Sequence, residues 1–399
     1  MKHDFTPDAI IERARISTGL HNLGSEHVCD YLEAWCADLG GPLLSDAGRA
    51  RLAKQAVRNL ETRLRIEDTL RRHPEIADVP LPRIVRIAGL ARSGTTLLHQ
   101  LLALGPARRA LLRWELVEPV PPPEAASYAI DPRIERVARS LQALRGTDLE
   151  RMHWVEATDP EECTWGFYDL SGILGRGCIG AMPRWADAIF DDRRDHRQTY
   201  LEYRRLVQLL LWRNPLPADG TLVLKCPTDN DCLRDFIDVF PEAVIVQIHR
   251  DPFRVVTSSC RIQQVINQPH FAEGARISDA DNLALVMTKT AQQADALVDV
   301  WRSRPDLVTN VRYADLMAQP TETVAAVEDC LGLPDRGAAA QRVSGLLDRQ
   351  RSGGRAAPPA AYEDFGATPE RVRAEPAFAR YISTFDIPSE QERVSAPHG

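Results

Sequence analysis

Long hydrophobic runs are absent from this sequence of 399 residues. No apolar stretch reaches the roughly 18 residues needed to span a membrane, and residues 1–8 lack the apolar segment of a secretory signal. Hydrophobic residues make up 44% of the chain and charged residues 26%, which excludes collagen, coiled coil and wholesale disorder. We therefore expect a globular protein of the cytoplasm without a membrane span.

Cysteine pairs with the spacing of a metal or redox site are absent, and lysine is scarce. None of the eight cysteines forms a Cys-x-x-Cys pair, which argues against a zinc ribbon or a thioredoxin-like site, and we predict no metal site. Of the 49 basic residues only Lys2, Lys54, Lys225 and Lys289 are lysine, and the other 45 are arginine. The net charge of −7 argues against a general nucleic-acid-binding protein, although a local basic pocket can still hold an anion.

The hydrophobic pattern divides the chain into regions. Residues 1–80 have the spacing of amphipathic helices and offer a cap on a larger domain or a surface for homo-oligomer formation. Residues 81–380 alternate strand and helix patterns, and 381–399 are expected to be a C-terminal tail. Inside the second region, residues 110–220 contain a proline cluster and five of the seven tryptophans, which favours a helical insertion. Residues 335–370 are rich in Ala, Gly, Arg and Pro, as expected of a loop or mobile arm.

Short β-branched runs alternate with amphipathic segments in the second region. Residues 243–248 are almost continuously apolar, which is typical of a strand buried on both faces of a parallel sheet. The sequence therefore predicts an α/β fold with a central parallel sheet flanked by helices. The expected strands are residues 84–88, 221–224, 243–248 and 307–313, and the expected helices are residues 95–104, 232–240, 252–265, 281–302 and 321–331.

The sharpest motif is Gly89–Thr96, which reads Gly-Leu-Ala-Arg-Ser-Gly-Thr-Thr at an expected strand-to-helix turn. Such a turn aims backbone N–H groups and the positive helix end at an anion, and the hydroxyls of Ser93, Thr95 and Thr96 add donors. The spacing resembles the triphosphatase loop Gly-x4-Gly-Lys-Ser/Thr. However, Thr95 stands at the lysine position, and the nearest cation is Arg92. The alternative is an ordinary strand–turn–helix connection, which the coincidence of strand, glycines, cation and hydroxyls makes the weaker reading.

A second motif covers His249–Ser258. Arg250 closes a buried strand, a proline starts a helix, and Ser258 follows eight residues after the arginine. Two helical turns cover about seven residues, so the hydroxyl can point back toward the strand end. A forked guanidinium and a hydroxyl that converge there suit a phosphate. The alternative is an arginine paired with Asp251 and a serine on a solvated helix face.

The two motifs in this order resemble sulfotransferases that use 3′-phosphoadenosine 5′-phosphosulfate (PAPS). A third segment, Val311–Leu316, is similar to the Tyr-Glu-Asp-Leu element that lies near the adenosine in that family, and the resemblance covers about residues 82–380. It implies a P-loop-like sulfotransferase fold and PAPS as co-substrate. It also implies that Arg92, Ser93, Gly94, Thr95 and Thr96 hold the 5′-phosphosulfate, and that Arg250, Ser258 and Tyr313 hold the 3′-phosphate and adenosine.

The nearest subgroup is the bacterial branch related to tyrosylprotein sulfotransferases, which has arginine in the 5′ loop. The chain departs from the family pattern at Ala91, where the loop proline is expected, and at Ala314, where an acidic residue is expected. The loss of the proline affects the rigidity of the turn rather than phosphate binding. The matching segments are Trp114–Glu115, His153 ahead of Glu161–Cys163, and Lys225–Pro227.

The resemblance implies a mechanism of in-line displacement on sulfur, in which the protein positions groups and stabilises charge. Arg92 is the candidate cation beside the leaving oxygen, and Lys225 would meet the same sulfuryl group from another side. The acceptor hydroxyl needs a general base, for which Glu115 is ranked narrowly ahead of His153. The alternatives are a surface salt bridge for Glu115 and a buried structural role for His153. Glu161 and Glu162 are expected to support the site.

The sequence names no acceptor beyond a hydroxyl-bearing small molecule. Trp114, Trp154, Trp165, Phe167 and Tyr168 would either line an acceptor pocket or belong to the core. Two other functions stay open at this level. A P-loop-like phosphotransferase or nucleotide hydrolase would need magnesium and a lysine that the loop lacks, and a non-catalytic protein would bind an adenosine bisphosphate and act through a partner.

Overall fold

The structure, a computed structural model, describes residues 5–390 except 26, 106, 164–179, 181, 190–194, 334–338 and 353–364. Five parallel strands form one sheet in the order β2-β3-β1-β4-β5. Strands β2 and β3 lie on one side of β1, and β4 and β5 lie on the other. The strand order therefore reverses at β1, and α/β sheets bind ligands at such a switch point. The strands are β1 (Arg83–Ala88), β2 (Arg108–Ala110), β3 (Thr221–Lys225), β4 (Ala243–His249) and β5 (Val308–Arg312).

The parallel sheet flanked by helices that the sequence predicted is confirmed. Four of the strands begin and end within one residue of their expected positions. The remaining strand, β2, was not expected because it contains only three residues, too few to show an alternating pattern. In the register of the sheet, Ile87 of β1 lies beside Lys225 of β3 and Val246 of β4. The carboxyl ends of these three strands therefore meet at one edge.

Helices cover both faces of the sheet. Val85 and Ile87 pack toward α4 (Thr95–Ala103), α15 (Pro320–Cys330) and α16 (Ala339–Ser352). Ile84 and Ala88 point to the other face, where the larger core lies, because successive side chains of a strand alternate. That face is covered by α10 (Arg197–Trp212), α11 (Leu233–Val239), α12 (Pro252–Asn267) and α13 (Asp279–Ser303).

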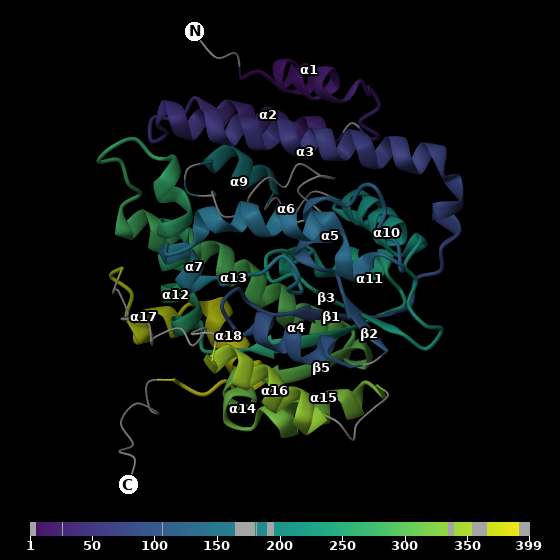
Figure 1. The fold of residues 1–399 in the computed structure, drawn as a ribbon. Helices are drawn as coiled ribbons and strands as arrows, with labels where there is room; N and C mark the ends of the chain where they lie inside the picture. Colours follow the sequence, from purple (N-terminus) through teal and green to yellow (C-terminus); the bar gives the residue numbers. More distant parts are fainter. Residues whose placement is uncertain are drawn as a thin grey trace.

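The N-terminal segment is helical, with α1 (Pro7–Thr18), α2 (His27–Leu39) and α3 (Asp46–Arg72). Thr6 and Ser45 cap α1 and α3 through their hydroxyls, which accept the N–H groups of Ala9 and Gly48. The buried side chains of all three helices belong to the same core cluster as one face of the sheet. Figure 1 shows α1 to α3 at one end of the molecule and α14 to α16 at the other.

The remaining helices lie in the insertion and after β5. In the insertion they are α5 (Arg113–Val117), α6 (Pro132–Leu141), α7 (Asp148–Met152) and α9 (Pro183–Ile189), and after β5 they are α14 (Tyr313–Ala318), α17 (Pro369–Arg373) and α18 (Pro376–Phe385). Short 3-10 helices cover Pro74–Asp78, Tyr128–Ile130, Gln142–Leu144, Asn230–Cys232, Gln268–His270 and Pro305–Leu307.

The prediction of a loop over 335–370 is wrong for residues 339–352, which form α16. The side chains of Val343 and Leu346 are buried in the core cluster beneath α15, so tertiary packing stabilises a helix in a segment of mixed composition. Residues 353–364 lie outside the described residues. Helix α18 crosses the expected start of the tail at 381.

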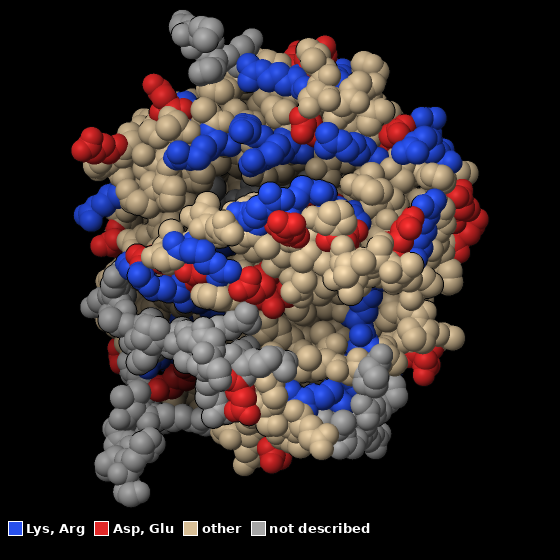
Figure 2. All heavy atoms as spheres, in the orientation of Figure 1, with Lys and Arg blue, Asp and Glu red and all other residues tan. Residues whose placement is uncertain are grey.

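Charge is unevenly distributed over the surface. Figure 2 shows Lys and Arg side chains gathered in a row over α3, where Arg51, Lys54, Arg58 and Arg65 are exposed. A chain with a net charge of −7 thus still presents a row of basic side chains along α3. Among the described residues, no helix is both long enough and apolar enough to cross a membrane.

Candidate phosphate-binding and transfer site

The loop between β1 and α4 has a backbone that is open to an anion. Gly89 and Gly94 adopt positive φ angles of 145° and 92°. A Cβ on Gly89 would lie 2.5 Å from the carbonyl oxygen of Ile248, and a Cβ on Gly94 would lie 2.6 Å from the ring of Tyr313, so neither position admits a side chain. Among the described residues, no side chain caps the N-terminus of α4. Its first N–H groups are therefore available to bind an anion.

Asn230 anchors the start of this loop. Its amide nitrogen donates to the carbonyl oxygens of Gly89 and Pro227 at 2.9 and 3.0 Å, and the N–H of Gly89 donates to its amide oxygen at 3.2 Å. The side chain is fully buried. Sequence reasoning missed this residue because 141 positions separate it from Gly89.

We expect Asn230→Ala to lower the free energy of unfolding by about 1–3 kcal/mol, because buried backbone groups of Gly89 and Pro227 lose their partner. Urea denaturation of the variant would measure this loss. Asn22→Ala is the matched control, since the Asn22 side chain lies on the surface and accepts a local bond from the N–H of Gly24. Its effect should stay within about 0.5 kcal/mol. Equal stabilities of the two variants would contradict the anchoring role.

Arg92 connects the loop to two other elements. Its Nε donates to Ser258 Oγ at 3.0 Å, and its Nη2 donates to the carbonyl oxygen of Met152 at 3.2 Å. Burial lowers the pKa of Arg92, and the charge of Arg250 lowers it further. The φ angle of Arg92 is 71°, which is unusual for a residue with a side chain. Such strain is typical of a functional loop.

Arg250 lies directly after β4 and faces the same loop. Its Nη1 donates to the carbonyl oxygen of Arg92 at 2.9 Å, and its guanidinium lies 4.1 Å from the centre of the Tyr313 ring, a cation–π contact. Since the same ring packs against Gly94, the structure brings the residues expected at the two ends of the cofactor into one cluster. Ser258 belongs to it through its bond with Arg92.

Lys225 ends β3 with a fully buried side chain. Its Nζ donates to Glu162 Oε1 at 2.7 Å and to Thr96 Oγ1 at 3.3 Å. The partner is held in place because the N–H of Cys163 donates to the carbonyl oxygen of Lys225 at 2.9 Å. The ammonium therefore contacts the loop between β1 and α4, residues 89–96, which we call the phosphate loop. It is paired there with the carboxylate of Glu162.

His153 lies at the C-terminal cap of α7, directly after Met152, whose carbonyl accepts from Arg92. Burial lowers the pKa of the His153 imidazole, while the charges of Glu161 and Glu162 oppose this shift. A lowered pKa keeps the ring neutral at pH 7, the state in which it accepts a proton. Its charged neighbours also include Lys225 and Arg92.

Glu161 is a charged neighbour of both His153 and Lys225. It is buried, and its Oε2 accepts from Arg113 Nη1 at 2.7 Å. Burial alone would raise the pKa of its carboxyl group, but the positive charges around it lower the pKa below its usual value. Glu161 thus places a buried carboxyl group beside Arg113 and near His153.

Glu115 is engaged in a different network. Its Oε1 accepts from the N–H of Leu112 at 2.8 Å and from the Tyr128 hydroxyl at 3.0 Å, and its Oε2 accepts from Arg109 Nη2 at 2.6 Å. The side chain is fully buried at the start of α5. These bonds connect the start of α5 to Arg109 and Tyr128. The ion pair with Arg109 is buried on the Glu115 side, whereas the alternative offered from the sequence was a surface salt bridge.

Of the five aromatic residues considered for an acceptor pocket, the structure describes Trp114 and Trp154. Trp114 is fully buried in a small core cluster beside α6, with Arg133 stacked over its ring. Trp154 carries Arg145 over its ring at 4.4 Å. The others, Trp165, Phe167 and Tyr168, lie outside the described residues.

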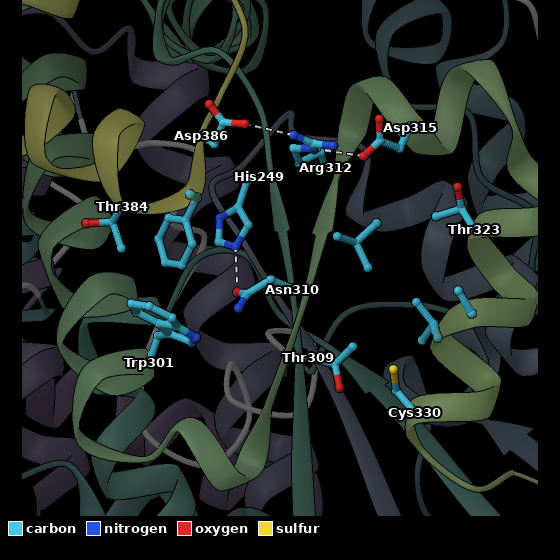
Figure 3. Close-up of a pocket in the computed structure, with 14 residues that line it drawn as sticks. His249, Trp301, Thr309, Asn310, Arg312, Asp315, Thr323, Cys330, Thr384 and Asp386 are labelled. Atoms are coloured by element: carbon cyan, nitrogen blue, oxygen red, sulfur yellow. Dashed lines mark hydrogen bonds and ion pairs between the residues drawn. The ribbon is translucent and has the colours of Figure 1, made fainter.

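A cavity of about 510 Å³ lies elsewhere, beside the outer edge of β5 (Figure 3). It is lined by Thr309, Arg312, Trp301 and Cys330, among other residues, and it does not include the phosphate loop. In the described part of the chain, no group of three or more His, Cys, Asp or Glu side chains is arranged to hold a metal ion.

A strand, a glycine loop and a helix N-terminus at the switch point of a parallel sheet form the arrangement with which many α/β proteins bind phosphate groups. A family model described as "Sulfotransferase family" matches residues 82–337. The chain belongs to that family.

Individual relatives agree with this assignment. The chain is 24% identical over 276 residues to omega-hydroxy-beta-dihydromenaquinone-9 sulfotransferase Stf3 of Mycobacterium tuberculosis, and the match covers 65% of this chain but only 64% of that protein. The fold is similar to sulfotransferase STF9 from Mycobacterium avium, with a TM-score of 0.85 at 25% identity over 98% of this chain and 99% of that one. It is also similar to sulfotransferase STF1 from Mycobacterium tuberculosis, with a TM-score of 0.76 at 24% identity, over 94% and 98% of the two chains.

Proposed function

We propose that this chain transfers a sulfuryl group from PAPS to a hydroxyl group of a small-molecule acceptor. The observation that carries the proposal is the cluster of Arg92, Lys225 and Arg250 around an uncapped helix N-terminus. Three cations and a row of N–H donors suit a ligand with phosphate groups at both ends and a transferable anionic group. Membership in the sulfotransferase family supports sulfuryl rather than phosphoryl transfer.

The loop residues Ser93, Gly94, Thr95 and Thr96 would hold the 5′-phosphosulfate. Ser93 supports this role, because its buried hydroxyl has no hydrogen-bond partner within the described ranges and buried polar groups normally have one. At the other end, Arg250 and Ser258 would hold the 3′-phosphate. Tyr313 stacks on Arg250 and would limit how far the adenosine moves.

In the transfer step the acceptor oxygen forms a bond to sulfur while the bond between sulfur and the bridging phosphate oxygen breaks. Arg92 and Lys225 would stabilise the negative charge that develops on the leaving oxygen. His153 would accept the hydroxyl proton of the acceptor. The carboxylates of Glu161 and Glu162 would then stabilise the imidazolium.

We place His153 ahead of Glu115 as the general base. His153 follows the residue whose carbonyl binds Arg92, and its lowered pKa keeps it neutral at pH 7. The two oxygens of Glu115 already accept three hydrogen bonds. Proton transfer to Glu115 would weaken the bond from Arg109 and remove the charge that balances that buried cation.

The acceptor remains a class rather than a compound. The name of one relative gives an omega-hydroxy dihydromenaquinone as its acceptor, which is a small molecule that carries a hydroxyl group. By this similarity we infer a hydroxyl-bearing small molecule for this chain too. A screen of phenols, primary alcohols and prenylated quinols would narrow the class.

Calorimetric titration with adenosine 3′,5′-bisphosphate, in the absence of magnesium, tests the cofactor class. We expect Arg250→Met to weaken binding at least about tenfold, because a charge-assisted bidentate contact to the 3′-phosphate is lost. Binding of adenosine 5′-monophosphate should change by less than about twofold. ATP bound only with magnesium, together with no binding of the bisphosphate, would favour a phosphotransferase instead.

A further inference from the structure

The C-terminal segment that follows α18 reaches the arginine expected to bind the 3′-phosphate. Glu390 accepts from Arg250 Nε at 2.8 Å through Oε1 and from Nη2 at 2.9 Å through Oε2. This is the bidentate geometry in which a guanidinium binds a carboxylate or a phosphate. In sequence, 140 positions separate the two residues.

Glu390 is held at its backbone as well. Its N–H donates to Asp251 Oδ2 at 3.1 Å, and Asp251 is the N-cap of α12 and pairs with Arg373 at 2.9 Å. Both ends of the residue are therefore fixed against the strand end that carries Arg250. A carboxylate held in this way competes effectively for the guanidinium, since little freedom is lost on pairing.

The docking of α18 explains why the segment arrives at this position. The Tyr381 hydroxyl lies 3.0 Å from His249 Nδ1, and the Phe385 ring stacks on the His249 ring at 3.7 Å between centroids. Since His249 directly precedes Arg250, α18 packs on the residue next to the arginine. The chain turns immediately after Phe385 and continues to Glu390.

A second carboxylate of the same segment pairs with the neighbouring strand. Asp386 Oδ2 accepts from Arg312 Nη1 at 3.1 Å, and Arg312 also donates to Asp315 (Figure 3). Asp386 and Glu390 thus bind the arginines at the ends of β5 and β4. Only Glu390 binds the arginine that the proposed function assigns to the cofactor.

Resting on the proposed function, we propose that Glu390 competes with the 3′-phosphate of the cofactor for Arg250 and so sets the affinity for adenosine 3′,5′-bisphosphate ligands. Arg250 uses Nε and Nη2 for Glu390 and Nη1 for the Arg92 carbonyl. A phosphate that binds the same two donors of Arg250, Nε and Nη2, must displace the carboxylate of Glu390. Two anions side by side would also repel each other. Cofactor binding therefore moves Glu390 away from the strand end.

The test compares wild type with Glu390→Gln, a change of nearly equal size, by calorimetry with two ligands. We expect the variant to bind adenosine 3′,5′-bisphosphate about three- to tenfold more tightly, because the neutral amide is a weaker competitor for Arg250. Adenosine 5′-monophosphate lacks the 3′-phosphate, and its dissociation constant should change by less than about twofold.

Two controls separate competition from a general loosening of the segment. Asp386→Asn removes the ion pair with Arg312 and leaves Glu390 in place, so bisphosphate affinity should not change. In the Arg250→Met background, Glu390→Gln should have no effect. Unchanged or weaker bisphosphate binding by Glu390→Gln, or equal tightening in Asp386→Asn, would overturn the proposal. Absence of bisphosphate binding to both wild type and Glu390→Gln would instead refute the proposed function itself.

Discussion

Substitution of Lys225 by methionine is expected to lower the rate of sulfuryl transfer by about 100- to 1000-fold, the usual effect of removing one group that stabilises transition-state charge. The buried ammonium donates to Thr96 in the phosphate loop, beside the expected position of the leaving oxygen. Methionine keeps the length and the apolar character of the stem. The rate is measured as release of adenosine 3′,5′-bisphosphate from PAPS, both with an acceptor found by screening and in slow hydrolysis by water.

The substitution also removes the partner of Glu162, so stability must be measured beside activity. The double variant Lys225→Met with Glu162→Gln should regain part of the lost stability, because no uncompensated carboxylate remains, while its rate stays low. Lys54→Met is the matched control, since Lys54 is exposed on α3. A rate within about tenfold of wild type for Lys225→Met would contradict the catalytic role.

Replacement of His153 by asparagine is expected to lower kcat/KM by about 100- to 10,000-fold, the range for a lost general base. The pH profile gives the sharper test. Burial lowers the pKa of His153 below its usual value, so in wild type the neutral base is present at pH 7. The activity of the wild-type enzyme should therefore fall only below about pH 6.5, and this fall forms the acidic limb of the pH profile. In the variant this acidic limb should disappear.

Glu115→Gln is the comparison for this assignment. It keeps the volume of a side chain that accepts hydrogen bonds from Arg109 and Tyr128, so its main effect should be on stability, and the acidic limb should persist. If Glu115→Gln loses the limb and His153→Asn keeps it, the roles of the two residues are reversed. Thermal unfolding of both variants distinguishes loss of fold from loss of catalysis.

The phosphate loop was predictable because its signal is local. The run Gly89–Thr96 encodes a strand end, a tight turn and a helix start within eight residues, and positive φ angles at two glycines follow from the same short segment. Alternating patterns of strand and helix likewise predicted the parallel sheet. The sequence related Arg250 to this loop only through the resemblance to sulfotransferases, which assigns both to the two ends of one cofactor.

The division between Glu115 and His153 was not predictable from the sequence. Both are polar residues of one insertion, and their spacing to Lys225 does not indicate which of them faces the loop. The proposal of His153 as the base rests on the bonds of Arg109 and Tyr128 with Glu115 and on the bond of Arg92 with Met152 beside His153. Asn230 was missed for the same reason, since its partner lies 141 positions away.

The sequence by itself determined the α/β fold, the phosphate loop and the resemblance to sulfotransferases, because each depends on patterns within a few residues or on the order of motifs. Only the tertiary structure decided which charges meet. Lys225 and Glu162 are 63 positions apart, and Arg250 and Glu390 are 140 positions apart. The strength of an ion pair depends on distance in space and on burial, and spacing along a chain specifies neither for segments joined through a folded core.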